Sequence, residues 1–290
     1  MTENHVTVYE VGPRDGFQNE AGIVPTKHKI ALIDLLSETG LRYIEATSFV
    51  SPNWVPQMAD AADVMAGIAR KPGVTYAALT PNMKGLEAAL ATGADEVAIF
   101  GSASESFSQK NINCTIAESL ERFAPVAKAA LAAGVSLRGY VSCVIACPYE
   151  GTIAPEPVRD ITQALLDLGC GEVSLGDTIG KGTSESAANL LDVLVGTIKA
   201  DLLAGHFHDT DGTALANVET ALSYGLRCFD SAIGGLGGCP YAPGAKGNLS
   251  TISLVEMLQA EGWETGLDMG KLHVAEAYLQ TNIAGVADAL

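Results

Sequence analysis

Short apolar runs alternate with longer amphipathic segments along the chain. Each run is rich in Val, Ile and Ala and is bounded by glycine or polar residues. Runs this short predict buried strands rather than helices. Eight such strands are expected, at Val6–Val11, Tyr43–Ala46, Thr75–Leu79, Glu96–Phe100, Ser136–Val144, Glu172–Leu175, Leu203–His208 and Cys228–Ile233.

The segments between these runs have the apolar spacing of helices. In "TKHKIALIDLLSETG" the apolar side chains from Ile30 to Leu36 build one face, and Gly40 ends the helix. In "TIAESLERFAPVAKAALAAGV" Thr115 and Glu118 have the spacing of a capping box, and a glycine again closes the helix. Strands and helices therefore alternate throughout.

Eight strand–helix units follow one another without a linker or a change in composition. They predict one domain over residues 1–290 and favour an α/β fold, the closed (β/α)8 TIM barrel, with a doubly wound open sheet as the alternative. The segments "TGLRYIE", "TGADEVAI", "LGCGEVSL" and "YGLRCFDS" each join a helix end to a new strand through a tight turn, which supports the barrel. Residues from about 266 to 290 predict one or two additional C-terminal helices.

The acidic composition restricts the partners of the protein. A formal net charge of -17 argues against nucleic acid, because phosphate binding depends on clustered Lys and Arg, although local basic groups could hold one phosphorylated ligand. No window approaches the roughly 18 apolar residues that span a membrane. The N-terminal "MTENHVTVYE" lacks a secretory signal pattern, so we expect a cytoplasmic protein without a membrane partner.

Polar side chains gather where the predicted strands end. In a barrel, the carboxyl ends of all strands form one face, and active sites lie there. A solvated loop is the ordinary interpretation of any one of these polar segments, but their occurrence after every strand favours a shared site. The strand ends supply Arg14, Asp15, Gln18, Glu45, Thr80, Asn82, Ser102, Ser142, Cys143, Asp177, Thr178, His206, His208, Asp209 and Asn248.

The segment "GHFHD" predicts a metal site. His206 and His208 are two residues apart on a strand, so both imidazoles point into the barrel. A pair of hydrogen-bonded structural histidines is the alternative, but Asp15 and Asn248 add oxygen ligands at the same face. This mixed set without thiolate favours Mg²⁺ or Mn²⁺, with Co²⁺ or Zn²⁺ as alternatives, acting as Lewis acid and template.

The glycine-rich segment "GGLGGCPYAPGAKGN" predicts a mobile loop over the site. Pro240 occupies the last glycine position of a dinucleotide fingerprint, so that motif is absent. Most of the six cysteines are expected to be buried thiols of a reducing compartment, but this loop would carry Cys239 into the site. A flexible surface loop with an incidental thiol is the alternative.

Arg14 is expected to stabilise negative charge, because a guanidinium does not deprotonate in the accessible pH range. An oxygen on which charge develops, such as that of an enolate, is the natural recipient. A surface ion pair is the commoner fate of an arginine, yet the position of Arg14 at a strand end beside Asp15 argues against it.

Taken together, these residues resemble the 3-hydroxy-3-methylglutaryl-CoA lyases among the metal-dependent carbon–carbon lyases and synthases. The resemblance runs almost end to end through "EVGPRDGFQNE", "IEATSFVSPNWVPQMAD", "NINCTIAES", "GYVSC", "CPYEG", "SLGDTIG", "HFHDTDGTALAN" and "GGLGGCPYAPGAKGN". It implies a TIM barrel, an acyl-CoA substrate, a homodimer or higher homo-oligomer, and a role in leucine degradation and ketone-body formation.

The resemblance also implies roles for individual residues. The metal ligands correspond to Asp15, His206, His208 and Asn248, the charge-stabilising arginine to Arg14, and the loop cysteine to Cys239. Glu45 and Asp177 fall on further catalytic positions, and Gln18 joins Arg14 in substrate binding.

The implied reaction is cleavage of 3-hydroxy-3-methylglutaryl-CoA to acetyl-CoA and acetoacetate. In this retro-Claisen reaction the tertiary hydroxyl and distal carboxylate are chelated by the metal, and a base takes the hydroxyl proton. Asp15, His206 and metal-bound water are the candidates for the base. Cleavage between C2 and C3 leaves a thioester enolate beside Arg14, which Cys239 or a nearby acid protonates.

Two departures from the family pattern leave other substrates open. Phe17 replaces a leucine, and Ala21 replaces a residue that is often basic, which admits a related 3-hydroxyacyl-CoA such as citramalyl-CoA. A related aldolase or a synthase is a second alternative, although the chain leaves no room for the regulatory region of such synthases. A non-enzymatic metal-binding scaffold is a third, disfavoured because Arg14 and Cys239 are both present.

Overall fold

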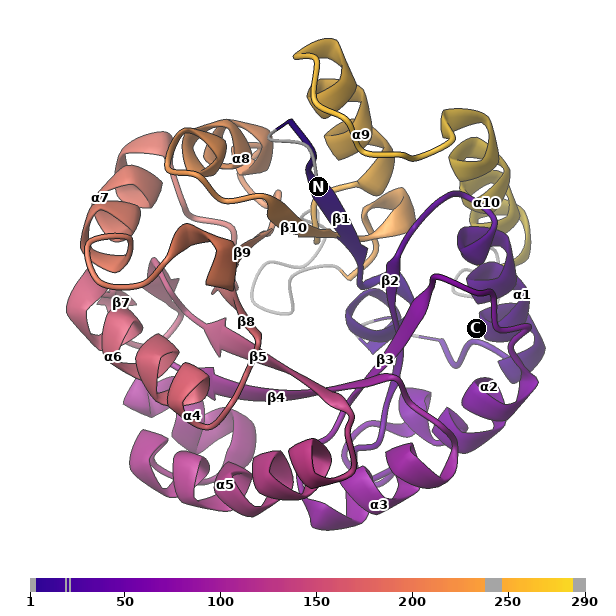
Figure 1. The fold of residues 1–290 in the computed structure, drawn as a ribbon, viewed down its shortest axis with the longest axis horizontal. Helices are drawn as coiled ribbons and strands as arrows, with labels where there is room; N and C mark the ends of the chain where they lie inside the picture. Colours follow the sequence, from indigo (N-terminus) through magenta and orange to yellow (C-terminus); the bar gives the residue numbers. More distant parts are fainter. Residues whose placement is uncertain (1–3, 19, 21, 238–246, 284–290) are drawn as a thin grey trace.

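The strands close into a parallel barrel ringed by helices (Figure 1). The computed structural model describes residues 4–18, 20, 22–237 and 247–283. Around the barrel the order is β1-β10-β9-β8-β5-β4-β3-β2, with β1 paired to both β10 and β2, so the predicted TIM barrel is confirmed. The strands are β1 (Thr7–Glu10), β2 (Tyr43–Ser48), β3 (Thr75–Leu79), β4 (Glu96–Ser102), β5 (Ser136–Ser142), β8 (Glu172–Asp177), β9 (Leu203–Phe207) and β10 (Cys228–Ser231).

The helices cover the outside of the barrel and bury their apolar faces against the strands. The predicted capping box is present: Thr115 Oγ1 accepts from Glu118 N at 3.1 Å, and Glu118 Oε2 accepts from Thr115 N at 2.9 Å. Among the described residues, no helix is long and apolar enough to cross a membrane. The helices are α1 (Thr26–Ser37), α2 (Ala61–Gly67), α3 (Met83–Ala91), α4 (Glu105–Ile112), α5 (Ile116–Ala132), α6 (Pro155–Asp167), α7 (Ser184–Leu194), α8 (Ala214–Ser223), α9 (Thr251–Ala260) and α10 (Met269–Asn282).

The last of these, α10, extends the barrel beyond its eighth unit. It lies beside α1 on the outer ring, so the first and last α-helices of the described chain are neighbours (Figure 1). Gly40, with φ +100°, ends the helical region after α1, and a Cβ at this position would collide with the carbonyl oxygen of Gly266. The predicted additional helical segment is therefore represented by α10 among the described residues.

A small antiparallel hairpin after β5 was not expected from the sequence. It consists of β6 (Ala146–Cys147) and β7 (Gly151–Thr152). Strands of two residues have no measurable periodicity, which explains why the apolar pattern did not indicate them.

The barrel contains a network of charged and aromatic side chains, which we call the interior charge cluster: Arg138, Asp230, Glu172, Tyr140 and Tyr9. The Arg138 guanidinium is buried and lies 2.7 Å from Asp230 Oδ1 and 2.9 Å from Glu172 Oε1. It also donates to the hydroxyl of Tyr140 at 2.9 Å and stacks 3.9 Å from the ring centre of Tyr9. This cluster extends through the barrel interior from Glu172, the first residue of β8, to Asp230, which lies 3.0 Å from His206.

Candidate metal centre

A short π-helical segment, η1 (Gly12–Gly16), positions the polar side chains after β1. Glu10 Oε1 accepts from the backbone amides of Gly12 at 2.8 Å and Ile233 at 2.9 Å, which ties η1 to the end of β10. A Cβ at Gly12 would lie 2.6 Å from that oxygen, so any larger residue would displace the Glu10 carboxylate from these two amides. The turn presents Arg14 and Asp15 to the mouth of the barrel.

Arg14 is held between two carboxylates. Its Nε donates to Glu45 Oε2 at 2.6 Å, and its Nη1 donates to Asp15 Oδ1 at 2.6 Å. The guanidinium also lies 5.3 Å from the ring centre of Tyr140. Burial opposes the charged form, but Glu45 and Asp15 raise the pKa of Arg14 above its usual value, so the side chain is a fixed cation.

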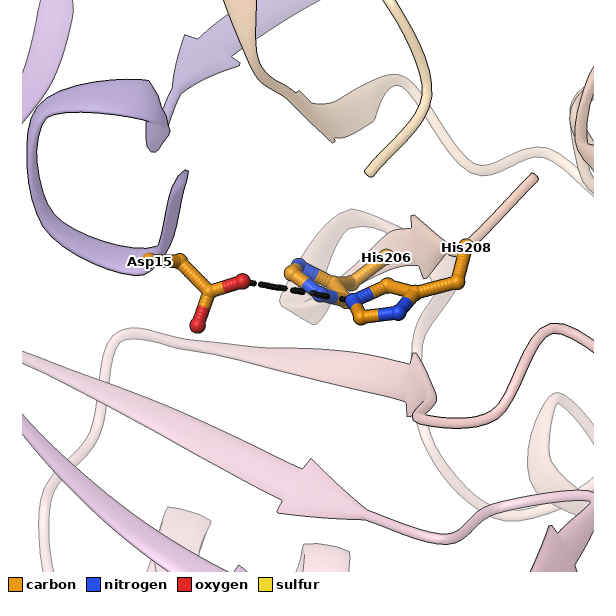
Figure 2. A group of neighbouring side chains, drawn as sticks. All are labelled: Asp15, His206 and His208. Carbon is orange, nitrogen blue, oxygen red and sulfur yellow. Dashed lines mark ion pairs between the residues drawn. The ribbon is translucent and has the colours of Figure 1, made fainter. Parts of the chain in front are cut away.

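Asp15, His206 and His208 converge at one point. Figure 2 shows the carboxylate facing both imidazoles, and Asp15 Oδ2 lies 4.0 Å from His206 Nε2 and 3.9 Å from His208 Nε2. One potential ligand atom from each residue lies within 4.8 Å of the others. These separations exceed hydrogen-bond distance and suit three ligands around one cation.

The electrostatics of Asp15 and His208 favour cation binding. Burial alone would raise the pKa of Asp15, but Arg14 and the two histidines lower it to about 2, so the carboxylate is ionised. Burial and the neighbouring His206 lower the pKa of His208 to about 4, so its imidazole is neutral. An ionised carboxylate and a neutral imidazole are the forms that bind metals.

The two histidines differ in their partners. His206 Nδ1 lies 3.0 Å from Asp230 Oδ2, and this carboxylate raises the pKa of His206 although burial lowers it. His208 Nδ1 is buried and has no hydrogen-bond partner among the residues that the structure describes. Both rings line the cavity at the mouth of the barrel, whereas Phe207 between them packs in the apolar core, which agrees with the predicted alternation.

Asn248 joins this group through its amide nitrogen. Its Nδ2 donates to Asp15 Oδ2 at 2.9 Å and to the carbonyl oxygen of Leu236 at 3.0 Å. A role as an oxygen ligand requires the carboxamide to turn over and give up both contacts. Asn248 therefore lies at the predicted place, and its role as a ligand stays a prediction.

The other predicted site residues lie at different depths. Gln18 lines the same cavity as Arg14 and Asp15, whereas Glu45 is fully buried behind Arg14. Asp177 is also fully buried, and its oxygens accept from the backbone amides of Lys181 at 3.2 Å and Gly182 at 2.7 Å. Glu45 thus contacts Arg14, and Asp177 contacts the backbone of the loop that follows β8. Cys239 lies outside the described residues.

A cavity of about 570 Å³ opens above the three potential ligands. Its floor includes Arg14, Asp15 and the two histidines, whereas Lys110 and Arg122 contribute positive charge to its wall. Trp54, which is 86% exposed, also lines it. The lining further includes Gln18, Val50, Ser51, Val55, Leu79, Pro81, Asn82, Phe100, Phe107, Asn111, Ile112, Asn113, Phe123, Tyr140, Val141, Ser142, Gly176 and Thr178.

Sequence reasoning missed the residues below the site. Asp230 contacts His206, and Tyr140 lines the cavity and meets the His206 ring edge-on at 80°. Both belong to the interior charge cluster with Arg138. A charged residue within a predicted buried strand, as in "SLRGYVS" and "CFDS", was the available signal.

Fold and site together define a class, the TIM-barrel proteins with a carboxylate–imidazole candidate metal centre at the carboxyl face of the barrel. The HMGL-like family model matches residues 5–279 of this sequence. The chain belongs to the HMGL-like family.

Individual relatives agree with this assignment. A protein from Bos taurus named "Hydroxymethylglutaryl-CoA lyase, mitochondrial" is 58% identical over 274 residues, which cover 94% of this chain and 84% of the relative. The crystal structure of an HMG-CoA lyase from Brucella melitensis is 58% identical, has a TM-score of 0.94, and matches over 95% of this chain and 98% of that chain. A lyase structure from Acinetobacter baumannii, in complex with coenzyme A and 3-methylmalate, is 36% identical with a TM-score of 0.92 over 99% of this chain and 93% of that chain.

Proposed function

We propose that this protein is a metal-dependent lyase that cleaves 3-hydroxy-3-methylglutaryl-CoA to acetyl-CoA and acetoacetate. The observation that carries the proposal is the convergence of Asp15, His206 and His208 beside Arg14 at the floor of one cavity. The similarity to named hydroxymethylglutaryl-CoA lyases over nearly the whole chain supports the choice of reaction.

The position of Phe17 gives no support to a different acyl group. Phe17 departs from the family pattern, but its side chain is fully buried in the apolar core and does not line the cavity. A substitution away from the substrate gives no reason to expect a different acyl group. Ala21, the second departure, lies outside the described residues. Citramalyl-CoA and similar 3-hydroxyacyl-CoA thioesters stay as alternative substrates.

The proposed cation would be held by Asp15, His206 and His208, with Asn248 as a fourth ligand. When bound there, a divalent ion such as Mg²⁺ or Mn²⁺ supplies a Lewis acid that polarises and orients the substrate oxygens. Asp15, His206 and metal-bound water are the candidates for the base that takes the substrate hydroxyl proton, and Asp15 and His206 both line the cavity. With Nε2 as a ligand and Nδ1 facing Asp230, the His206 ring would have no free lone pair, which favours Asp15 as the protein base.

Arg14 would stabilise the thioester enolate that the cleavage leaves. Its two contacts with Glu45 and Asp15 fix the guanidinium plane before substrate binds, so little reorganisation accompanies the reaction. Glu45 therefore acts on the reaction through Arg14. Asp177 shapes the loop after β8, and Gln18 is available to bind the substrate from the same cavity wall.

The cavity also suits the CoA portion of the substrate. Lys110 and Arg122 place two cations on its wall, in a protein whose formal net charge is -17. Local positive charge on an acidic protein is a suitable partner for the phosphates of CoA. Trp54 offers an exposed aromatic surface at the same cavity.

The decisive experiment is a coupled assay for acetyl-CoA release over a panel of 3-hydroxyacyl-CoA thioesters, with and without chelator. We expect 3-hydroxy-3-methylglutaryl-CoA to have the highest kcat/KM and the activity to disappear on exhaustive chelation. A preference for citramalyl-CoA would replace the proposed substrate. Full activity without metal would refute the proposed mechanism.

Cys239 is proposed as the acid that protonates the enolate, on the basis of its glycine-rich sequence context. We expect Cys239→Ser to fold and bind metal normally but turn over far more slowly, because a hydroxyl is a much weaker acid than a thiol. The thiol should alkylate faster than the five other cysteines, which are all buried, and a substrate analogue should protect it. Near-normal turnover with unprotected labelling would make Cys239 an incidental loop thiol.

The cellular setting is also part of the proposal. We propose a single catalytic domain that assembles as a homodimer or higher homo-oligomer, acts in the cytoplasm, and serves leucine degradation or ketone-body formation. Light scattering of the purified protein and fractionation of its native cells test the assembly and the compartment.

A further inference from the structure

Asp230 lies at the centre of a hydrogen-bond network immediately below His206. Its Oδ1 accepts from Arg138 Nη2 at 2.7 Å. Its Oδ2 accepts from Ser174 Oγ at 2.7 Å and from Arg138 Nη1 at 3.3 Å, and it lies 3.0 Å from His206 Nδ1. The side chain of Asp230 is fully buried, so these protein groups determine its orientation.

This network determines which nitrogen of His206 carries the proton. A carboxylate paired with an arginine can only accept, so the Nδ1 that faces it must be the N–H of the ring. The lone pair of the neutral imidazole is then on Nε2, the atom that faces Asp15 Oδ2 at 4.0 Å. Only a nitrogen with a free lone pair can bind a cation.

We propose that Asp230 is a positioning residue that fixes the His206 tautomer and ring orientation needed for cation binding. The proposal rests on the metal-binding site of the proposed function and adds a residue to its machinery. His208 is the internal comparison, because its Nδ1 has no partner among the described residues. The site therefore combines one oriented imidazole with one that lacks such a support.

The contacts of Asp230 predict an unusual effect of the smallest substitution, Asp230→Asn. Arg138 has only donors and contacts both oxygens, but its contact with Oδ1, at 2.7 Å, is shorter than that with Oδ2, at 3.3 Å, so we expect it to hold the amide oxygen at the place of Oδ1. The amide NH2 group then lies at the place of Oδ2 and points at His206 Nδ1. His206 must accept that hydrogen bond, its proton moves to Nε2, and the ligand atom is blocked although the shape of the side chain is conserved.

The first measurement uses the unmodified protein. Nitrogen-15 NMR of labelled histidine in the metal-free protein, at an alkaline pH where the imidazoles are neutral, reports the protonated nitrogen. The His206 signal is assigned by its loss in His206→Gln. We expect the proton on Nδ1, and a proton on Nε2 would overturn the proposal without any need for an Asp230 variant.

The second measurement compares Mn²⁺ affinity, by titration calorimetry and electron paramagnetic resonance, in the wild type and Asp230→Asn. We expect the affinity to fall by about 10- to 100-fold, as for other groups that orient metal ligands, with the His206 proton moved to Nε2. Glu172→Gln is the matched control, because Glu172 contacts the same Arg138 but not His206. Its affinity should stay within about twofold of the wild type on the same reasoning.

Two results would contradict the inference: wild-type Mn²⁺ affinity in Asp230→Asn, or an equal loss in Asp230→Asn and Glu172→Gln with the His206 proton unmoved. Neither measurement uses the lyase reaction. A failure of the proposed substrate with the expected tautomer and Mn²⁺ results would therefore refute the function and leave the role of Asp230 intact.

Discussion

Charged groups inside the barrel differ from those at its mouth in how closely they are paired. In the interior charge cluster, Arg138 Nη2 lies 2.7 Å from Asp230 Oδ1, and every oxygen of that carboxylate has a donor. At the mouth, Asp15 Oδ2 lies 3.9 to 4.0 Å from the two imidazoles, too far for hydrogen bonds. The carboxylates of both regions accept hydrogen bonds, since Asp15 accepts from Arg14 and Asn248. The difference is that the two imidazoles at the mouth face Asp15 at distances that leave room for a cation.

This difference separates stability from function. A buried ion pair whose polar atoms are all hydrogen-bonded contributes to stability mainly because breaking it leaves a buried charge without a partner. A set of ligands held apart gains its favourable interactions when a cation binds, and that binding then stabilises the folded state. Substitutions in the interior charge cluster should therefore lower the free energy of unfolding, whereas substitutions at the mouth should lower turnover or metal affinity.

The largest expected effect is in the interior, for Arg138→Met. The substitution removes the cation and leaves Asp230 buried without its partner, which costs about 3–5 kcal/mol of unfolding free energy. Urea denaturation of the metal-free protein measures the loss as a shift of the transition midpoint. Glu172→Gln removes a partner that is 26% exposed and should cost about 1 kcal/mol or less. An equal loss of unfolding free energy in Arg138→Met and Glu172→Gln would show that burial of the partner does not determine the cost.

Arg14→Lys should have a smaller effect, on turnover rather than on folding. Lysine keeps the charge but cannot donate from two edges of one plane to Glu45 and Asp15. We expect kcat to fall by about 10²-fold with a smaller change in KM, as for other groups that stabilise a transition-state charge. Steady-state kinetics on 3-hydroxy-3-methylglutaryl-CoA provide the measurement.

The matched control for this variant is Arg122→Lys, which changes a second arginine of the same cavity. Arg122 lies on the cavity wall without contact to the proposed ligands, so we expect its substitution to change KM more than kcat. A normal kcat in Arg14→Lys would assign Arg14 a structural role.

The sequence predicted the barrel because the strands are short apolar runs that end in polar residues, and most of them follow a helix closed by glycine. β4 and β9 begin where their runs begin, at Glu96 and Leu203. The same logic predicted the mouth, since His206 and His208 alternate with Phe207 and Asp15 follows a strand. Residue type and periodicity are sufficient for such features.

Other features depend on contacts between distant parts of the chain. Asp230 and Arg138 are 92 residues apart, and neither has a local pattern that indicates the other. The orientation of the Asn248 amide follows from Asp15 and Leu236, which the amino-acid type alone cannot specify. Such partners become visible only when the barrel closes.

The smallest expected effect on stability is that of His208→Ala, which removes the imidazole whose Nδ1 has no hydrogen-bond partner among the described residues. His208→Ala removes one of the three converging ligand atoms, and we expect Mn²⁺ affinity to fall by about 10- to 100-fold or more, the range known for disturbed metal sites. The metal-free protein should lose little stability, because His208 Nδ1 has no hydrogen-bond partner among the described residues and its removal relieves a buried polar atom. His28→Ala is the control, since His28 contacts Tyr278 on the outer ring and should leave the affinity unchanged. A large loss of stability in metal-free His208→Ala, with unchanged Mn²⁺ affinity, would place His208 with the satisfied interior rather than with the open mouth.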